Sequence, residues 1–281
     1  MENTFFKSPV VTVDWLKENI NNDKLILLNA TISNPNAKNV EEDNLQIKES
    51  RFFDLGKKFS DTSSDLPHTM VSPEVFQEEA RKIGINNDSI LVVYDKLGVF
   101  SSPRVWWMFH AMRFKNIAVL DGGFPAWKKE GGETEEMELK EYPTGNFEAK
   151  YHYSSFCDKN YVKDTIDELM ITTCDARPEG RFCGTTPEPR PGLRGGHIPN
   201  SVNIPFTSII KDGKIVSKAE LEKAFDGISK THELIFSCGS GVTACILALA
   251  ATILGYEDIT VYDGSWSEWG IPSELPVVEG K

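Results

Sequence analysis

The feature that most constrains the fold of this chain is an internal repeat. Residues 91–127 read LVVYDKLGVFSSPRVWWMFHAMRFKNIAVLDGGFPAW, and residues 234–269 read LIFSCGSGVTACILALAATILGYEDITVYDGSWSEW. Both segments contain an apolar run, a loop with Gly-Val, an apolar helix, a second apolar run, Asp-Gly and a final Trp. Gly98 aligns with Gly241 at an offset of 143 residues, and the Asp-Gly pairs align at 142. Self-similarity on this scale predicts two copies of one domain.

The repeat extends toward the start of each copy. Residues 13–30 match residues 159–176 at an offset of 146, and a segment with helical periodicity follows Ser72 in one copy and Ser217 in the other. Serine is a preferred helix N-cap, and Pro73 fits the first helical turn. Each copy therefore alternates short strands with amphipathic helices, which favours an α/β fold with a parallel sheet flanked by helices.

The repeat also predicts the domain boundaries. The stretch from 130 to 150 is acidic, contains Gly and Pro, and has few large apolar residues, as is typical of a linker. We predict a first domain at 1–142, a linker at 143–153 and a second domain at 154–281.

Composition excludes several classes of partner. The formal net charge of −12 disfavours nucleic acid and anionic membrane surfaces, which select for excess Lys and Arg. No apolar stretch has the length of about 20 residues that a membrane-spanning helix needs. The five cysteines have no C-x-x-C spacing, so we expect reduced thiols in a cytoplasmic protein without a metal site.

One difference between the copies indicates chemistry. Asp95 in the first copy aligns with Cys238 in the second, and because Asp is a poor core residue, we expect Cys238 to be partly open to solvent. Gly239 and Gly241 allow the loop amides to point inward, and a helix starting near Val242 directs its positive end at the same place. Such surroundings stabilise a thiolate, so Cys238 is predicted to be a nucleophile rather than a buried structural thiol.

A glycine-bearing loop between a strand and a helix is also compatible with phosphate binding. The P-loop motif requires a lysine that this loop lacks. Cysteine-dependent phosphatases need an arginine six residues after the cysteine, where this chain has Ala244. A phosphate dianion would have no cationic partner in this loop, which argues against a phosphatase.

Six motifs together resemble the tandem rhodanese sulfurtransferases over essentially the whole chain. They are RFFD (51–54), SSPRVWW (101–107), VLDGGFPAW (119–127), EPRPGLRGGHIPNSVNIPF (188–206), CGSGVT (238–243) and YDGSWSEW (262–269). The resemblance implies two tandem rhodanese-like domains, each a parallel sheet flanked by helices. It also implies that the first domain, with Asp95 at the cysteine position, is catalytically inactive.

The resemblance is strongest to members that use 3-mercaptopyruvate, which implies a sulfurtransferase with no cofactor. Sulfur would pass through a persulfide on Cys238 to a thiol acceptor such as thioredoxin or glutathione, or to cyanide, with release of pyruvate. Gly239 and Ser240 are neutral where thiosulfate-preferring relatives carry basic side chains, which favours a 2-oxo acid donor. Two alternatives stay open: a thiosulfate sulfurtransferase, and a persulfide carrier without its own small-molecule donor.

The resemblance also assigns the site residues. Arginine forks suit a planar carboxylate, and the resemblance assigns Arg181 and Arg190 to this role. The alternative is that one of them, or nearby Arg177 or Arg194, only pairs with surface acids. The catalytic assignment is Cys238, Ser240 and His68, and the substrate-binding assignment is Arg181, Arg190, Gly239, Gly241, Val242 and Thr243.

The acid that would orient His68 is left open by the sequence. Relatives read F-F-D-x-D, whereas this chain has Gly56 in place of the second Asp. Asp54, Asp61 or Asp65 would have to substitute for it, or His68 only lines the site.

Overall fold

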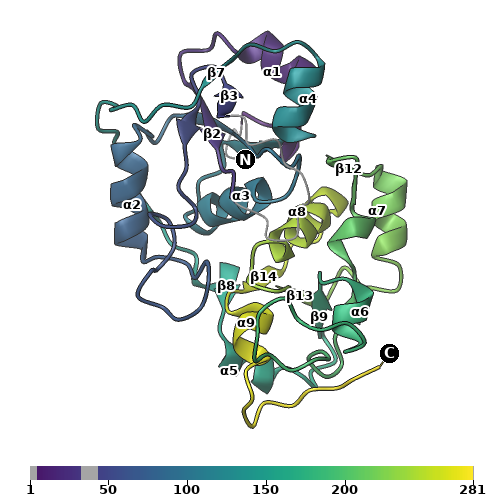
Figure 1. The fold of residues 1–281 in the computed structure, drawn as a ribbon. Helices are drawn as coiled ribbons and strands as arrows, with labels where there is room; N and C mark the ends of the chain where they lie inside the picture. The colour runs from purple at the N-terminus through teal and green to yellow at the C-terminus, as the bar shows by residue number, and fades with distance from the viewer. Residues whose placement is uncertain (1–4, 33–43, 281) are drawn as a thin grey trace. The chain divides into compact units, whose positions relative to one another are not determined.

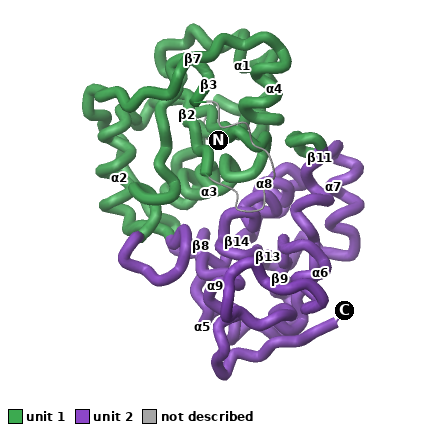
Figure 2. Tube along the Cα trace, in the orientation of Figure 1, with its two compact units in different colours: residues 1–61, 70–152, 212–215 green, residues 62–69, 153–211, 216–281 purple. Residues whose placement is uncertain are grey.

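A computed structural model describes residues 5–32 and 44–280 of the chain. The chain divides into two compact units, shown in different colours in Figure 2. Unit 1 consists of Met1–Asp61, Met70–His152 and Asp212–Ile215, and unit 2 of Thr62–Thr69, Tyr153–Lys211 and Val216–Lys281.

Unit 1 is built on a five-stranded sheet in the order β1-β6-β5-β2-β4, and all of its strand pairings are parallel. Figure 1 draws most of this unit in purple to teal. Two short strands form a separate antiparallel pair, β3 with β7. The strands of this unit are β1 (Val10–Val11), β2 (Leu25–Asn29), β3 (Leu45–Ile47), β4 (Arg51–Phe52), β5 (Ile90–Tyr94), β6 (Ile117–Leu120), β7 (Thr134–Glu136) and β12 (Lys214–Ile215).

Helices cover both faces of the unit 1 sheet. On one face, Phe124 and Trp127 share an apolar cluster with Val92 of β5. On the other face, the rings of Phe76 and Phe109 lie 5.0 Å apart, edge to face. The helices are α1 (Val13–Asn19) and α4 (Gly123–Lys129) on the first face, and α2 (Pro73–Lys82) and α3 (Ser102–Ala111) on the second. Side chains of β5 alternate between the two faces, which explains why the strand is apolar throughout.

Unit 2 has the same architecture. Its parallel sheet has the order β10-β9-β13-β14-β8. The strands are β8 (Phe156–Cys157), β9 (Ile171–Asp175), β10 (Val202–Asn203), β11 (Ile210–Lys211), β13 (Glu233–Ser237) and β14 (Ile259–Tyr262). Read from the other end, this order matches the unit 1 sheet strand for strand, which confirms the predicted duplication and the α/β fold.

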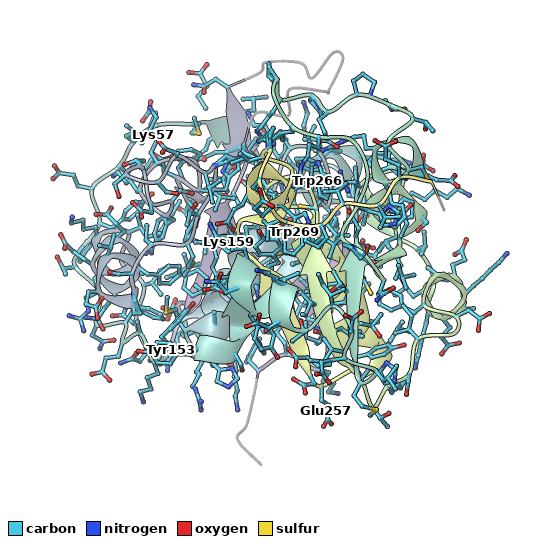
Figure 3. The ribbon with its side chains drawn as sticks, turned by 90° about the horizontal axis from the view of Figure 1, so that it is seen from below. Lys57, Tyr153, Lys159, Glu257, Trp266 and Trp269 are labelled. Atoms are coloured by element: carbon cyan, nitrogen blue, oxygen red, sulfur yellow. The ribbon has the colours of Figure 1, made fainter. Side chains whose placement is uncertain are left out.

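The helices of unit 2 also lie on both faces of its sheet. Val162, Trp266 and Trp269 cluster with Ile235, whereas Phe225 contacts Phe236 on the opposite face. Both tryptophans are buried and lie within the body of the unit in Figure 3. The helices are α5 (Lys159–Asp164), α6 (Glu179–Phe182), α7 (Lys218–Ala224), α8 (Ala244–Leu254) and α9 (Ser265–Trp269), with 3₁₀ turns η1 (Tyr153–Ser155) and η2 (Phe206–Ser208).

Two predicted helix starts are confirmed. Ser72 Oγ accepts a hydrogen bond from the Val75 amide at 3.3 Å, and Pro73 is the first residue of α2. Ser217 and Glu220 form a reciprocal capping box at the start of α7. Each cap provides a partner for a backbone N–H that the first helical turn would otherwise leave unpaired.

The units are not continuous along the sequence, which the repeat did not predict. Thr62–Thr69 comes from the first half of the chain but belongs to unit 2, and Asp212–Ile215 comes from the second half but belongs to unit 1. The two segments correspond in the repeat, because one lies between β4 and α2 and the other between β10 and α7. Each unit therefore includes a short segment from the other half of the sequence.

The stretch expected to be a linker is instead part of a folded unit through residue 152. Phe147 is fully buried, and the Arg81 guanidinium donates a hydrogen bond to its carbonyl oxygen at 2.7 Å. The amides of Gly145 and Phe147 donate to the carbonyls of Arg81 and Ile85. The buried Phe147 ring and these hydrogen bonds together attach the stretch to the core of unit 1.

Candidate active site

Cys238 lies immediately after β13, a central strand of the unit 2 sheet, and begins the loop that leads to α8. Gly241 has φ of +74°, a left-handed conformation that favours glycine. The helix starts at Ala244 with Thr243 as its N-cap, two residues later than the predicted start near Val242. In parallel α/β sheets, ligand sites form at this carboxyl end of the strands.

The expectation that Cys238 is partly open to solvent is wrong. Cys238 is only 1% exposed, and Asp95, the residue on which that expectation was based, is fully buried as well. Both residues directly follow a central strand of their sheet. Gly239 and Ser240, the next two residues of the unit 2 loop, are half-buried.

Helix α9 fixes the backbone at the cysteine. The Cys238 amide donates to Ser265 Oγ at 3.2 Å, and the Trp266 amide donates to the Cys238 carbonyl at 2.9 Å. Ser267 donates to the Gly239 carbonyl from both its amide, at 2.8 Å, and its hydroxyl, at 2.6 Å. Ser265 has φ of +47°, an uncommon conformation for a residue other than glycine, and such strain is often found at functional sites.

The corresponding loop of unit 1, which follows Asp95, binds a carboxylate. The carboxylate of Asp95 accepts hydrogen bonds from the amides of Leu97, Phe100, Ser101 and Ser102, at 2.9 to 3.0 Å, and from the Ser102 hydroxyl at 2.7 Å. Burial raises the pKa of Asp95, and the donors from Ser102 and Phe100 act in the opposite direction. Five donors converging on two oxygens form a cradle for an anion.

The unit 2 loop has matching donors without an internal acceptor. By the 143-residue offset, the amides of Leu97, Phe100 and Ser101 correspond to those of Ser240, Thr243 and Ala244. Within the described part of the chain, none of these three amides donates a hydrogen bond. The loop can therefore cradle an anion that the protein itself does not supply.

Two arginines, Arg181 and Arg190, lie beside this loop. A Cβ atom placed on Gly239 would lie 3.2 Å from a terminal nitrogen of Arg181 and 3.8 Å from one of Arg190. The loop thus brings together the predicted nucleophile, free amides and both predicted substrate-binding arginines.

The two arginines differ in their partners. Arg181 donates to both carboxylate oxygens of Glu188, with the shortest distance 2.5 Å, and its side chain is 16% exposed. Arg190 is half-buried and has no hydrogen bond or ion pair among residues 5–32 and 44–280. Arg190 is therefore the arginine whose charge is available to an external anion.

The other two arginines of this region have structural partners. The Arg177 guanidinium is buried, donates to Asp175, Glu188 and the Gly196 carbonyl, and stacks 3.9 Å from the Trp266 ring. Burial lowers the pKa of Arg177, but the two carboxylates outweigh this effect and raise it. Arg194 donates to the carbonyls of Trp269 and Leu275 at 2.8 Å, not to surface acids.

His68 is in the same unit as Cys238, because Thr62–Thr69 groups with unit 2. Its φ of +62° is another left-handed conformation at a residue other than glycine. Of the three acids considered as its partner, only Asp65 belongs to the same unit. The roles of His68 and Ser240 stay predictions.

All five cysteines lie in described residues and are free thiols. Burial raises the pKa of Cys157, and it raises the pKa of Cys174 to about 12, which makes both poor nucleophiles at neutral pH. Cys245 is fully buried in α8, and its thiol donates to the Gly241 carbonyl at 3.3 Å. Cys238 is the cysteine that directly follows a central strand and precedes the loop amides of Ser240, Thr243 and Ala244.

The sequence motifs do not mark Glu188, Ser265 and Ser267 as site residues. Glu188 stands two residues before Arg190, in a stretch whose arginines carry the resemblance. Ser265 aligns with Gly123, which has φ of +52°, so a serine at a position where the other copy has glycine was a readable signal.

No group of three or more metal-binding side chains lies together within residues 5–32 and 44–280. Over the same residues, no helix combines the length and the apolar character needed to cross a membrane.

Comparison with known proteins identifies the class of this fold. The model of the rhodanese-like domain matches residues 12–130 and 158–271, one match in each half of the repeat. The chain therefore belongs to the rhodanese family.

Relatives over the full length are sulfurtransferases. The 3-mercaptopyruvate sulfurtransferase of Escherichia coli strain K12 is 37% identical over 283 residues, which cover 99% of each chain. The thiosulfate sulfurtransferase of Rattus norvegicus is 36% identical over 286 residues, covering 97% of this chain and 96% of the relative. The crystal structure of SseA, a 3-mercaptopyruvate sulfotransferase from Escherichia coli, matches with a TM-score of 0.82 at 35% identity. The match covers 93% of this chain and 100% of the SseA chain.

Proposed function

We propose that this protein is a sulfurtransferase that moves the sulfur of 3-mercaptopyruvate through a Cys238 persulfide to a thiol acceptor or cyanide. The loop after Cys238 supports this function most directly, because the amides of Ser240, Thr243 and Ala244 have no acceptor among the described residues and Arg181 and Arg190 lie beside Gly239. A covalent sulfur intermediate needs a nucleophile and an anion cradle, and a 2-oxo acid needs a cation for its carboxylate.

The first step forms the persulfide. The Cys238 thiolate attacks the donor sulfur and a sulfur–sulfur bond forms. The carbon–sulfur bond breaks, and its electron pair passes into the enolate of pyruvate, which then takes up a proton. The loop amides stabilise the negative charge of the outer sulfur, as their counterparts in unit 1 stabilise the Asp95 carboxylate.

The second step returns the enzyme to its starting state. An acceptor thiolate attacks the outer sulfur, the sulfur–sulfur bond breaks, and its electron pair restores the Cys238 thiolate. We assign Ser240 and His68 to proton handling at the donor thiol, and Gly239, Gly241, Val242 and Thr243 to the cradle. Unit 1, with its cradle filled by Asp95, has a structural role.

The remaining assignments are part of the same proposal. The acceptor is a small or protein thiol, such as glutathione or thioredoxin, and the setting is the reducing cytoplasm, which suits free cysteines. Thiosulfate is the second candidate donor, because a full-length relative is a thiosulfate sulfurtransferase.

Steady-state kinetics with mercaptopyruvate and thiosulfate test the donor assignment. We expect wild type to have the higher kcat/KM for mercaptopyruvate, and Arg190→Ala to lower it by at least about tenfold, mainly through KM, because a charge-assisted contact to the carboxylate is lost. Lys163→Ala removes an exposed cation from the same unit and serves as the control. Equal turnover by Arg190→Ala and wild type would contradict the oxo-acid site, and turnover only with a persulfide-loaded desulfurase would support a carrier.

A further inference from the structure

The arginines beside the cysteine loop are part of a chain of alternating charges. Asp175 pairs with Arg177, Arg177 pairs with Glu188 at 2.8 Å, and Glu188 pairs with Arg181 at 2.5 Å. The Arg177 and Glu188 side chains are only 1% and 2% exposed, so water screens this chain weakly. Glu188 lies between the two guanidinium groups and accepts hydrogen bonds from both.

The charges within this chain cancel. It contains two carboxylates and two guanidinium groups, and the Arg181 end is the part that reaches the loop beside Gly239. Arg190 is the cation next to the loop that has no partner among the described residues. Among the described residues beside Gly239, the net positive charge offered to a donor therefore corresponds to that of Arg190, although two arginines are present.

We infer that Glu188 is a specificity-determining residue that, by neutralising Arg181, sets the site to favour a donor with one negative charge over a dianion such as thiosulfate. This inference rests on the proposed function, because it concerns the donor of that reaction. Glu188 acts through Arg181, which makes it a positioning residue. A monoanionic carboxylate matches one uncompensated cation, whereas a dianion would keep one charge unpaired in a desolvated site.

The competing explanation is that Glu188 only holds Arg177 and Arg181 in place. Two substitutions separate charge from structure. Glu188→Gln keeps the length of the side chain and removes its charge, while Glu188→Asp keeps the charge and shortens the side chain. Arg177 retains Asp175 and the Gly196 carbonyl in both variants, so the core around it keeps polar partners.

Binding of unreacted donors gives the most direct readout. In a Cys238→Ser background neither donor can transfer sulfur, so the Kd of thiosulfate and that of 3-mercaptopyruvate can be measured by titration calorimetry for the full chain. We expect Glu188→Gln to lower the ratio of the thiosulfate Kd to the mercaptopyruvate Kd by about tenfold, because the uncovered Arg181 charge attracts a dianion more strongly than a monoanion. Glu188→Asp should leave the ratio within about twofold of the background value, since it keeps the neutralising charge.

The outcomes for the two proposals are distinguishable. An unchanged ratio in Glu188→Gln, or an equal change in both Glu188 variants, would overturn the role of Glu188 even if wild type turns over mercaptopyruvate. Wild type without mercaptopyruvate turnover would contradict the proposed function, while a shifted Kd ratio would still support charge selection by Glu188. The same ratio taken from kcat/KM in the Cys238 enzyme should shift in the same direction.

Discussion

At the scale of single residues, the Asp95 carboxylate corresponds to the persulfide that Cys238 is proposed to form. A carboxylate oxygen of Asp95 is as many bonds from Cα as the outer sulfur of a persulfide on Cys238 would be. The loop around Asp95 directs four amides and a hydroxyl at the two oxygens of this carboxylate. Unit 1 therefore contains, in covalent form, the anion that unit 2 is proposed to acquire during catalysis.

We expect Asp95→Ala to destabilise the protein by about 3 kcal/mol, because it leaves several buried donors without an acceptor. Urea unfolding with tryptophan fluorescence measures this loss. Asp88→Ala is the matched control, because Asp88 is an exposed carboxylate of the same unit and its surface ion pair with Lys24 contributes little to stability. An Asp95→Ala variant as stable as Asp88→Ala would show that the donors do not depend on the carboxylate.

The sequence predicted the identity of these residues better than their environment. Cys238, Arg181 and Arg190 were identified from the motif, and the structure places them at one loop. The expected exposure of Cys238 was wrong. Alignment of the copies shows that Asp95 and Cys238 share a position, but it does not show that hydrogen bonds make a buried Asp favourable there. The role of Glu188 could not be predicted from the sequence, because it depends on contacts with both Arg177 and Arg181 that form only in the folded protein.

At the scale of elements, glycines in left-handed conformations set the loop geometry in both copies. Gly98 has φ of +101° and lies against Gly213, so that a Cβ atom on Gly98 would clash with the Gly213 carbonyl oxygen. The Ile215 amide donates to Asp121 at 2.9 Å, which fastens the same segment to unit 1. Strand and helix positions followed from periodicity, but this close backbone approach depends on residues far apart in sequence.

Gly98→Ala should therefore cost more stability than the same change at an open glycine. Gly131 has φ of +72°, and a Cβ atom added there would meet open space, so Gly131→Ala reports the backbone strain alone, about 1 kcal/mol. We expect Gly98→Ala to cost about 2 kcal/mol more, through the clash with Gly213. Urea unfolding compares the two variants, and faster hydrogen exchange at the Ile215 amide should accompany only Gly98→Ala. Equal effects of the two substitutions would mean that the contact with Gly213 adjusts freely.

At the scale of the whole molecule, duplication accounts for the two units, but neither unit is built from one half of the sequence alone. Thr62–Thr69 and Asp212–Ile215 each belong to the unit formed by the other half of the sequence. Neither segment has a composition that marks the exchange, since the contacts that assign it form only in the folded protein. The proposed catalytic His68 reaches the unit of Cys238 in this way.

Replacement of Thr62–Thr69 by a Gly/Ser segment of equal length should remove most sulfur transfer, by at least about tenfold, because it deletes His68 from unit 2. His68→Asn is the matched variant, since asparagine tolerates a left-handed backbone. If both variants lose kcat to the same extent, the His68 side chain is responsible for the loss. If only the Gly/Ser replacement lowers kcat, the segment contributes through packing. Full activity in both would contradict any role of this segment in the reaction.

Cys238 is the residue proposed to carry the transferred sulfur. Intact mass spectrometry after brief exposure of the protein to 3-mercaptopyruvate, without an acceptor, measures this transfer. We expect a gain of one sulfur atom that is absent in Cys238→Ser, is kept in Cys245→Ser, and is removed when a thiol acceptor is added. No gain in wild type, or a gain that persists in Cys238→Ser, would contradict it.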